Sequence, residues 1–490
     1  MPYQLLAYNQ SLALLTDLYQ LTMAYGYWKS GADNKESVFH LFFRKSPFKG
    51  GYSIACGLNY VIDYLQNFSF DESDISYLAS LRGNDGKPLF EKRFLDYLRG
   101  LKFECDMDAI AEGTVVFPHE PLLRVQGPII QCQILETVLL NIINFQTLVA
   151  TKASRICHAA GEEPVLEFGL RRAQGIDGAL AASRAAYIGG CSATSNVLAG
   201  KIFGIPVKGT HAHSWIMSFD DELEAFQAYA KAMPNNCVFL VDTYDTLEGV
   251  RKAIEAGKWL RQNGHEMIGI RLDSGDLAYL SIEARKMLDE AGFPNAKIVG
   301  SNDLDEHIIE SLKQQGAKIA IWGVGTKLIT AYDQPALGGV YKLSAIRLPG
   351  EDWKYKVKLS EQSIKVSNPG IQQVRRYFNE TENLADVIYD IRTDVSNGCI
   401  MIDPLDMTRQ KRILSKNTYQ DLLVPVFRKG KMVYSSPPLI EVKQKAKESL
   451  ERFHSGIKRL VNPHQYPVGI EKSLYALKTD LILRTREVTV

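Results

Sequence analysis

The sequence predicts an α/β barrel of parallel strands, flanked by a mixed α+β N-terminal domain and a C-terminal accessory region. From Val165 onward, short apolar strands alternate with segments of helical length, and such alternation is typical of parallel sheets with right-handed crossovers. About seven repeats favour a closed or nearly closed barrel over an open doubly wound sheet. Neither a Gly-x-Gly-x-x-Gly motif nor a Walker motif supports the open sheet.

A chain of 490 residues is too long for one simple core, so several domains are expected. We place the N-terminal α+β domain at residues 1–128, the barrel that carries the active site at 129–349, and the accessory region at 350–490. The N-terminal domain begins with helical spacing at 12–28 and an aromatic strand at 37–44. We expect the accessory region to pack on the N-terminal domain.

Periodicity predicts the elements in order. A long apolar helix, from Ile129 to about Ala159, precedes the barrel. The barrel strands are expected at residues 165–169, 204–208, 238–242, 266–271, 297–300, 318–322 and 339–346. Helices are expected at residues 178–199, 220–232, 246–263, 278–291 and 304–315. In the accessory region we expect antiparallel strands at 351–366, a hairpin at 424–434 and an amphipathic helix at 439–460.

Composition excludes several classes of protein. The 57 Lys and Arg residues nearly balance the 56 Asp and Glu residues, whereas a protein that coats nucleic acid has a basic excess. No apolar run reaches ~18 residues, so we expect no membrane span and no membrane partner. The N-terminus lacks the pattern of a signal peptide. Seven scattered cysteines without Cys-x-x-Cys spacing favour reduced thiols in the cytoplasm over a zinc knuckle.

Arg171 and Arg172 follow the first expected barrel strand. Adjacent guanidinium groups suit an anion with several oxygens, because arginine binds phosphate or carboxylate in a bidentate fork. Two interdomain salt bridges are the alternative. The position at a strand end favours anion binding, since barrel enzymes carry their chemistry at the carboxyl ends of the strands.

The second expected strand leads into Thr210, His211 and His213. Imidazole titrates near neutral pH, so a histidine here suits acid–base or nucleophilic chemistry. A structural histidine is the commoner alternative. A metal site would need a third ligand beyond the His-x-His pair.

Carboxylates follow the third and fourth strands. Asp242 follows the third, and capping of the next helix is its commoner role. The fourth leads into Arg271, Asp273 and Asp276, within a turn that contains glycine. We expect Asp276 to cap a helix, while Asp273 could accept ribose hydroxyl groups or hold Mg²⁺.

The fifth and sixth strands end in turns suited to phosphate. Asn302 follows the fifth, and Gly325 and Thr326 follow the sixth. Glycine lets backbone N–H groups approach a phosphate closely, and threonine adds a hydroxyl donor. Two such loops, with arginines at other strand ends, indicate a barrel enzyme that acts on a phosphorylated, anionic small molecule.

The same residues resemble the nicotinate phosphoribosyltransferase family. The resemblance lies in six blocks that occur in family order between residue 15 and about residue 345. These blocks are Leu-Thr-Asp-Leu-Tyr-Gln-Leu-Thr-Met at 15–23, Glu-Phe-Gly-Leu-Arg-Arg-Ala-Gln-Gly at 167–175, Gly-Thr-His-Ala-His-Ser at 209–214, Arg-Leu-Asp-Ser-Gly-Asp at 271–276, Ser-Asn-Asp at 301–303 and Gly-Val-Gly-Thr at 323–326. An ordered set of this kind is far more specific than any single motif.

The resemblance implies a type II phosphoribosyltransferase-like α/β barrel and a particular reaction. Nicotinate would attack C1 of 5-phosphoribosyl 1-diphosphate, giving nicotinate mononucleotide and diphosphate in NAD biosynthesis. In the family, ATP serves as co-substrate and its hydrolysis is coupled to the reaction through a phosphohistidine, with Mg²⁺ as the metal. A homodimer with shared active sites is also implied.

Carried over residue by residue, the resemblance assigns the following roles. His213 would be the phosphohistidine, with His211 at the variable position of its motif. Thr210, Arg271 and Tyr19 would contact nicotinate, with Arg271 at the carboxylate and Tyr19 reaching in from the partner subunit. Asn302, Gly325 and Thr326 would hold the 5-phosphate, Arg171 and Arg172 would neutralise diphosphate or carboxylate, and Asp273 would lie near ribose or Mg²⁺.

Three alternatives stay open at this stage. A nicotinamide phosphoribosyltransferase is the nearest, because the two bases differ by one charge; Arg271 favours nicotinate only modestly. A metal-dependent barrel hydrolase would use His211, His213, Asp242 and Asp273 as ligands. A barrel without catalysis, acting as an interaction module, is the third, and the intact polar strand ends argue against it.

Overall fold

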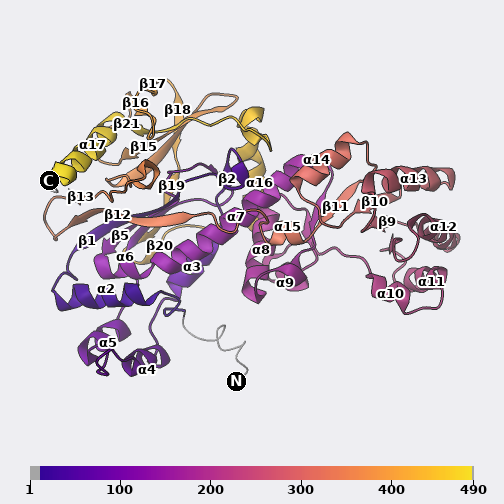
Figure 1. Ribbon diagram of the computed structural model, residues 1–490, viewed down its shortest axis with the longest axis horizontal. Coiled ribbons are helices and arrows are strands. Elements are labelled where there is room, and N and C mark those ends of the chain that lie inside the picture. Colours follow the sequence, from indigo (N-terminus) through magenta and orange to yellow (C-terminus); the bar gives the residue numbers. More distant parts are fainter. Residues whose placement is uncertain (1–11, 488–490) are drawn as a thin grey trace.

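The computed structural model describes residues 12–487 (Figure 1). The central helix α7, Glu136–Ala160, lies between a parallel sheet on one side and two further strand-rich layers on the other. In the part of the chain that the structure describes, none of the helices combines the length and apolar character that crossing a bilayer requires.

The parallel sheet has six strands in the order β7-β6-β11-β10-β9-β8. Their bounds are β6 Val165–Glu167, β7 Ala193–Thr194, β8 Val238–Leu240, β9 Gly269–Leu272, β10 Lys297–Gly300 and β11 Ile321–Val324. The helices that connect them are α8 Ile176–Ile188, α9 Val197–Phe203, α10 His213–Met217, α11 Glu222–Ala232, α12 Thr246–Gln262, α13 Leu277–Glu290 and α14 Glu306–Gln314. The predicted alternation of parallel strands and helices is confirmed.

The predicted helix at 178–199 and the predicted strand at 204–208 are wrong in detail. Helix α8 ends where Gly189 packs against α7, because a side chain at Gly189 would lie 2.3 Å from the Ala150 carbonyl oxygen. The chain then forms β7 inside the segment predicted as helix. Residues 204–208 contribute only an isolated parallel bridge, Val207 to Thr194, since the neighbouring Pro206 has no N–H to extend a ladder.

This bridge nearly closes the barrel. Thr194 in β7 accepts from Lys208 N–H at 3.0 Å, which places the segment leading to His211 beside β7. The Leu240 N–H of β8 donates to His211 Nε2 at 3.3 Å. The two edges of the six-stranded sheet are therefore joined through one bridge and one side chain rather than through a continuous ladder.

The last predicted barrel strand belongs to another sheet. Strand β12, Gly339–Arg347, pairs antiparallel with β1, Glu36–Phe43. Strand β1 is buried along nearly its whole length, so it needs a partner on both edges. The Phe39 ring stacks on that of Tyr341 at 4.9 Å between centroids, a cross-strand contact that stabilises the pairing.

The sheet that contains β1 has seven strands in the order β13-β12-β1-β5-β3-β19-β20. Its further strands are β3 Asp106–Ile110, β5 Leu123–Pro128, β13 Lys354–Tyr355, β19 Leu423–Arg428 and β20 Lys431–Met432. The predicted hairpin at 424–434 is confirmed as β19 and β20. Of the antiparallel strands predicted at 351–366, only the two residues of β13 form.

A six-stranded sheet from the C-terminal part covers this layer, in the order β17-β16-β21-β15-β14-β18. Its strands are β14 Gln372–Phe378, β15 Asn383–Asp390, β16 Gly398–Ile402, β17 Gln410–Leu414, β18 Thr418–Asp421 and β21 Val468–Glu471. The remaining helices of eight or more residues are α2 Leu18–Lys29, α3 Leu58–Gln66, α4 Glu72–Ser80, α5 Lys92–Arg99, α16 Leu439–Glu451 and α17 Lys472–Glu487. Arg376 in β14 forms a buried ion pair with Asp386 and donates to the Val115 carbonyl, so residues from the two ends of the chain share one interior.

Helix α7 is the common wall of these layers. The single helix predicted at 129–159 is broken at Leu135 into α6, Ile129–Ile134, and α7. On the barrel side, Lys152 and Arg155 of α7 form ion pairs with Glu306 of α14, at 2.7 and 2.8 Å. All three side chains are almost fully buried, so the two cations and the carboxylate need one another as partners.

A second buried ion pair joins the barrel to the N-terminal domain. Arg184 on α8 donates to both oxygens of Glu112, at 2.8 and 2.6 Å. Glu112 also accepts from the Gly57 N–H at 2.7 Å. The bidentate geometry and the third donor satisfy a carboxylate that would otherwise be costly to bury.

We expect Arg184→Gln to lower the free energy of unfolding by about 3–5 kcal/mol, because it leaves the Glu112 carboxylate buried without its cation. Chemical denaturation followed by circular dichroism measures the change. Arg251→Gln, which removes an exposed pair with Glu248 on α12, is the matched control and should change little. Equal effects of the two substitutions would contradict the importance of this contact.

Candidate active site

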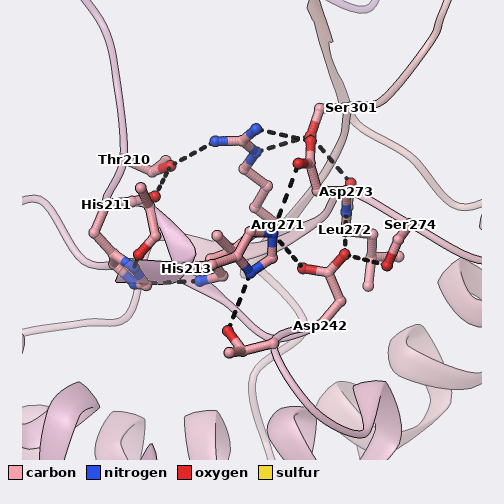
Figure 2. Close-up of polar contacts among 12 residues, drawn as sticks. Thr210, His211, His213, Asp242, Arg271, Leu272, Asp273, Ser274 and Ser301 are labelled. Atoms are coloured by element: carbon pink, nitrogen blue, oxygen red, sulfur yellow. Dashed lines mark hydrogen bonds and ion pairs between the residues drawn. The ribbon is translucent and has the colours of Figure 1, made fainter. Parts of the chain in front are cut away.

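The carboxyl ends of the parallel strands bring the candidate residues together at one edge (Figure 2). Strands β8, β9 and β10 are neighbours, with Arg271 paired in register to Leu240 on one side and Val299 on the other. Residues that follow each strand therefore meet, although they lie far apart in the chain. Thr210 and His213 join them from the segment that leads into α10.

The Arg271 guanidinium lies at the centre of this cluster. Its Nε donates to Ser301 Oγ at 2.8 Å, its Nη1 to Thr210 Oγ1 at 3.2 Å and its Nη2 to Asp273 Oδ1 at 2.8 Å. The face of the Phe168 ring lies 5.6 Å from the guanidinium carbon. Three of the five N–H groups are used, so one N–H remains on each terminal nitrogen.

Asp273 is held ionised by these partners. Burial by itself raises the pKa of its carboxyl group, but the charge of Arg271 and the hydrogen bonds from Ser301 and Arg271 outweigh burial, and the net pKa is lowered. The Ser301 hydroxyl donates to the same Oδ1 that accepts from Arg271. Asp273 therefore presents its other oxygen, Oδ2, to the rest of the site.

One carboxylate oxygen of Asp242 accepts no hydrogen bond from the described residues. Its side chain is 0% exposed. Oδ2 accepts from the Asp273 N–H at 2.9 Å and from Ser274 Oγ at 2.6 Å. Oδ1 is buried and has no hydrogen-bond partner within the described residues. The expected capping role is wrong, because Asp245 caps α12 instead and leaves Asp242 free to face the site.

His213 lies over the two carboxylates. Its Nδ1 is 3.1 Å from Thr243 Oγ1, while Nε2 lies 4.0 Å from Asp242 Oδ1 and 3.8 Å from Asp273 Oδ2. Both distances to Nε2 are too long for direct hydrogen bonds. With its side chain 41% exposed, His213 is accessible to a ligand that enters above the carboxylates.

His211 has a structural position instead. Its Nε2 accepts from the Leu240 N–H, and its ring packs edge-on against Tyr229 at 4.9 Å. Burial lowers the pKa of this imidazole to about 4, so the ring is neutral. Since Nε2 is occupied, His211 drops out of the ligand set that a metal-dependent hydrolase would require.

Comparison with known proteins agrees with this geometry. Residues 14–144 match the N-terminal domain of nicotinate phosphoribosyltransferase, residues 164–382 match the nicotinate phosphoribosyltransferase family, and residues 371–478 match its C-terminal domain. The nicotinate phosphoribosyltransferase of Bacillus subtilis is 46% identical over 482 residues, which cover 97% of this chain and 96% of that protein. The chain belongs to the nicotinate phosphoribosyltransferase family.

Relatives extend across kingdoms within the family. The nicotinate phosphoribosyltransferase of Dictyostelium discoideum is 39% identical over 94% of this chain and 87% of its own length. The crystal structure of human nicotinic acid phosphoribosyltransferase superposes with a TM-score of 0.81 at 32% identity, covering 95% of this chain and 99% of that one. This match confirms the predicted type II phosphoribosyltransferase-like fold.

The residues expected to hold phosphate lie on neighbouring strand ends of the family barrel. Asn302 follows β10 with an exposed side chain and a left-handed backbone, φ 117°. Gly325 and Thr326 follow β11 at the start of α15, Thr326–Ile329. Strands β10 and β11 pair in parallel, and a side chain at Gly323 would lie 3.3 Å from Ser301 Cβ. The two turns therefore adjoin each other.

Arg171, Arg172 and Tyr19 are not joined to the cluster within this chain. Arg171 and Arg172 lie exposed on a single 3-10 turn after β6, and neither guanidinium forms a hydrogen bond or ion pair with the residues that the structure describes. Tyr19 is 47% exposed on α2. Figure 1 places α2 and α10 at opposite ends of the molecule.

The sequence did not predict three contributors to the site. It assigned another role, or no role, to Asp242, Thr243 and Ser301. Each is a polar residue within three positions of the end of a barrel strand, which is the signal that could have found them. Within residues 12–487 no group of three or more His, Cys, Asp or Glu side chains is arranged to hold a metal ion. Mg²⁺ needs only one or two protein carboxylates beside substrate phosphates, and Asp242 Oδ1 with Asp273 Oδ2 fits that requirement.

We expect His211→Gln to reduce the loss of unfolding free energy that the parent protein shows as the pH falls into the acid range. The folded pKa of about 4 lies below the ordinary value of about 6.5, so the unfolded chain binds more protons between these values and stability falls as the pH falls. Between pH 6.5 and pH 5 this contributes about 2 kcal/mol in the parent protein. Denaturant midpoints measured across this range check the slope.

Glutamine at position 211 offers a neutral acceptor to Leu240, and it does not titrate. His307→Gln, at an exposed position on α14, is the control and should leave the slope unchanged. An unchanged slope in His211→Gln would show that His211 is protonated with its ordinary pKa in the fold.

Proposed function

We propose that the chain transfers the 5-phosphoribosyl group of 5-phosphoribosyl 1-diphosphate to nicotinate. The bond between C1 and the diphosphate oxygen breaks as the pyridine nitrogen bonds to C1, and nicotinate mononucleotide and diphosphate leave. The observation that carries the proposal is the Arg271 fork, with two free N–H groups at the end of β9. Full-length relatives named for this activity support it.

Arg271 suits the carboxylate of nicotinate. One N–H remains on each terminal nitrogen, and two parallel N–H donors match the two oxygens of a carboxylate. Thr210 and Ser301 hold the guanidinium in place from either side, so little side-chain entropy is lost on binding. Nicotinamide would offer such a fork only one oxygen.

The phosphates of the donor have separate partners in this proposal. Asn302, Gly325 and Thr326 lie on adjoining turns, where the first N–H groups of α15 have no acceptor within the helix. We assign the 5-phosphate to them. The exposed Arg171 and Arg172 are then available to the diphosphate, which carries more charge than one arginine neutralises.

In this proposal the carboxylates of Asp273 and Asp242 act on the reaction at C1 of the ribosyl donor. Positive charge develops on the ribosyl ring as the diphosphate leaves, and the ionised Asp273 lies where it can stabilise that charge or accept from the ribose hydroxyl groups. Asp242 Oδ1 and Asp273 Oδ2 would hold Mg²⁺, which supplies charge neutralisation for the diphosphate when bound. Hydrogen bonds from Ser274 Oγ and from the Asp273 N–H hold the Asp242 carboxylate in place beside that of Asp273.

His213 is the residue we assign to ATP coupling. If Nδ1–H donates to Thr243, the lone pair lies on Nε2, which is exposed toward the substrate side. The γ-phosphoryl group of ATP would bond to this nitrogen while the bond to ADP breaks. Water would later release the phosphate, coupling ATP hydrolysis to the transfer.

Tyr19 would complete the site from a second copy of the chain. The α10 helix of the same chain lies at the far end of the molecule from α2. Helix α2 and the turn before it expose the apolar side chains of Leu15, Leu18, Tyr19 and Met23. Exposed apolar side chains also gather on α9, at Val197, Leu198 and Ile202. Two such surfaces on one chain are what a symmetric dimer buries, with the same contact made twice.

The first test is turnover by the purified chain with 5-phosphoribosyl 1-diphosphate, Mg²⁺ and either nicotinate or nicotinamide, with and without ATP. We expect nicotinate mononucleotide, and a rate that ATP increases. His213→Asn should abolish the increase, because asparagine cannot accept a phosphoryl group, while the rate without ATP stays near that of the parent protein. Chromatography of the mononucleotide measures both rates.

His265→Asn, a histidine on the barrel surface that hydrogen-bonds to Asn235, is the matched control and should keep the ATP effect. Turnover of nicotinamide alone would move the substrate assignment to the nicotinamide alternative. An ATP effect that survives in His213→Asn would remove this histidine from the coupling step.

A shared site predicts complementation between two inactive variants. We expect Tyr19→Ala and His213→Ala, each impaired alone, to recover about a quarter of the ATP-stimulated activity after unfolding and refolding together, because half of the dimers then hold one intact site of two. The same variants refolded separately and then mixed should show no recovery. Absence of recovery after joint refolding would mean that Tyr19 acts within its own chain or not at all.

A further inference from the structure

A pocket lies at the amino ends of β6 and β7, opposite the strand ends that carry the candidate active site. It has a volume of about 780 Å³ and is lined by the C-terminal part of α7, residues 161–165, the turn after α8, helix α16 and Lys458. Figure 1 shows α16 beside α7 and α8. The size of the pocket suits a small-molecule ligand, and nothing in the proposed reaction uses it.

Two cysteines meet at the wall of this pocket. Cys157 on α7 lines the pocket and is partly exposed, whereas Cys191, in the turn after α8, is 1% exposed. Their thiols are hydrogen-bonded, and this contact is the first cause, before burial, of the raised pKa of Cys191. Both cysteines are free. An accessible sulfur and a buried sulfur are therefore direct neighbours.

A glycine allows the two cysteines to approach. A side chain at Gly190, whose φ is 125°, would lie 3.1 Å from Cys157 Sγ. The chain therefore passes directly over Cys157 at this point. The Ser192 N–H then donates to the Val165 carbonyl at 2.8 Å, where β7 begins to pair with β6. Cys191 lies between these two contacts, so the backbone fixes its position against α7.

Lys443 on α16 places a positive charge beside the two sulfurs. Its Nζ donates to the Cys191 carbonyl at 2.7 Å and lies 4.2 Å from the centroid of the Tyr187 ring. Burial lowers the pKa of this ammonium group, and the charges of Cys191 and Cys157 oppose the effect. In the part of the chain that the structure describes, no carboxylate forms an ion pair with Lys443. Its charge is therefore available to stabilise a thiolate at this pair.

Access from the pocket distinguishes this pair from the other cysteines. Cys105 Sγ and Cys132 Sγ also lie close together, 3.7 Å apart, but both residues are 0% exposed. Cys399 is partly exposed, and its sulfur contacts the Tyr377 hydroxyl at 3.9 Å. Of the seven cysteines, all of which lie within the described residues, Cys157 alone combines exposure with a second sulfur in contact.

We propose that Cys157 and Cys191 form a modification site for low-molecular-weight disulfides, which convert the pair into an intramolecular disulfide. The Cys157 thiolate attacks one sulfur of the reagent and expels a first thiolate, which leaves a mixed disulfide on Cys157. Cys191 then loses its proton, and its sulfur attacks Cys157 Sγ and expels a second thiolate. The two cysteines give up two electrons and two protons, and the reagent gains them and becomes two thiols.

The order of the two attacks follows from the structure. Cys157 is reached from the pocket, whereas Cys191 is buried. A mixed disulfide on Cys157 also removes the thiol that raises the pKa of Cys191 most. Proton loss from Cys191 therefore becomes easier once Cys157 has reacted.

The rim of the pocket carries charges of both signs. Its lining includes Lys443, Lys447 and Lys458 and also Glu162, Glu441 and Glu451. A peptide-like disulfide that carries both ammonium and carboxylate groups complements such a rim better than a simple anion does. Glutathione disulfide is a probe of this class.

Incubation of the reduced full-length chain with glutathione disulfide, followed by alkylation of the remaining thiols, proteolysis and mass spectrometry, tests the proposal. In the parent protein we expect a peptide that links Cys157 to Cys191 and that dithiothreitol separates. Cys191→Ser should stop at the mixed disulfide, with glutathione retained on Cys157. Cys157→Ser should leave Cys191 reduced, because Cys191 is buried.

Two matched controls accompany these variants. Cys132→Ser removes one member of the enclosed pair and should leave the link between Cys157 and Cys191 unchanged. In the Cys191→Ser background, Lys443→Gln should slow formation of the mixed disulfide about threefold, because less thiolate forms without the nearby charge. Lys447→Gln, on the same rim and 4.0 Å from Glu451, should leave this rate unchanged.

A mixed disulfide that persists on Cys157 of the parent protein without closing onto Cys191 would overturn the proposal, as would a Cys157 that stays unmodified. Linkage of Cys105 to Cys132 at the same rate would overturn it too, because it would show that the exchange takes place in unfolded chains. These outcomes are read from the peptides of the unsubstituted chain, so they depend neither on the folding of a variant nor on the proposed transferase activity.

Discussion

The Arg271 guanidinium is the constraint on which the candidate active site depends. It joins the ends of β9 and β10 and the segment before α10 through hydrogen bonds to Asp273, Ser301 and Thr210. Because a guanidinium is planar and stays protonated, its three partners are held around one plane with little freedom. Asp273 in turn positions Asp242 through its backbone N–H. Arg271 therefore determines, directly for Asp273 and through Asp273 for Asp242, where the two carboxylates below His213 lie.

Buried polar and charged groups in this molecule differ in whether the chain itself pairs them. Several are paired inside the fold, as Arg184 is with Glu112 and Arg376 with Asp386, because a buried charge without a partner is costly. Other buried polar atoms have no hydrogen-bond partner among the described residues, and Asp242 Oδ1 at the candidate active site is one of them. Such atoms are tolerated where a ligand supplies the missing partner.

The sequence predicted the parallel barrel and its helices well, since strong apolar periodicity reports burial directly. It failed where pairing between distant strands decided the outcome. Strand β12 has the same apolar pattern as a barrel strand, yet it pairs with β1, some 300 residues away, through Phe39 and Tyr341. The two residues of β7 are too short for any period to detect, and Pro206 limited the strand that was expected in their place.

The sequence by itself determined which polar residues would stand at the strand ends, because each follows an apolar run along the chain. Arg271, Asp273 and His213 were found in this way and lie together. Only the tertiary structure decided what each residue does there. It made His211 a buried acceptor for Leu240, made Asp245 rather than Asp242 the helix cap, and left Tyr19 remote from its own α10. These roles depend on neighbours across strands and helices, and adjacency along the chain carries no information about such neighbours.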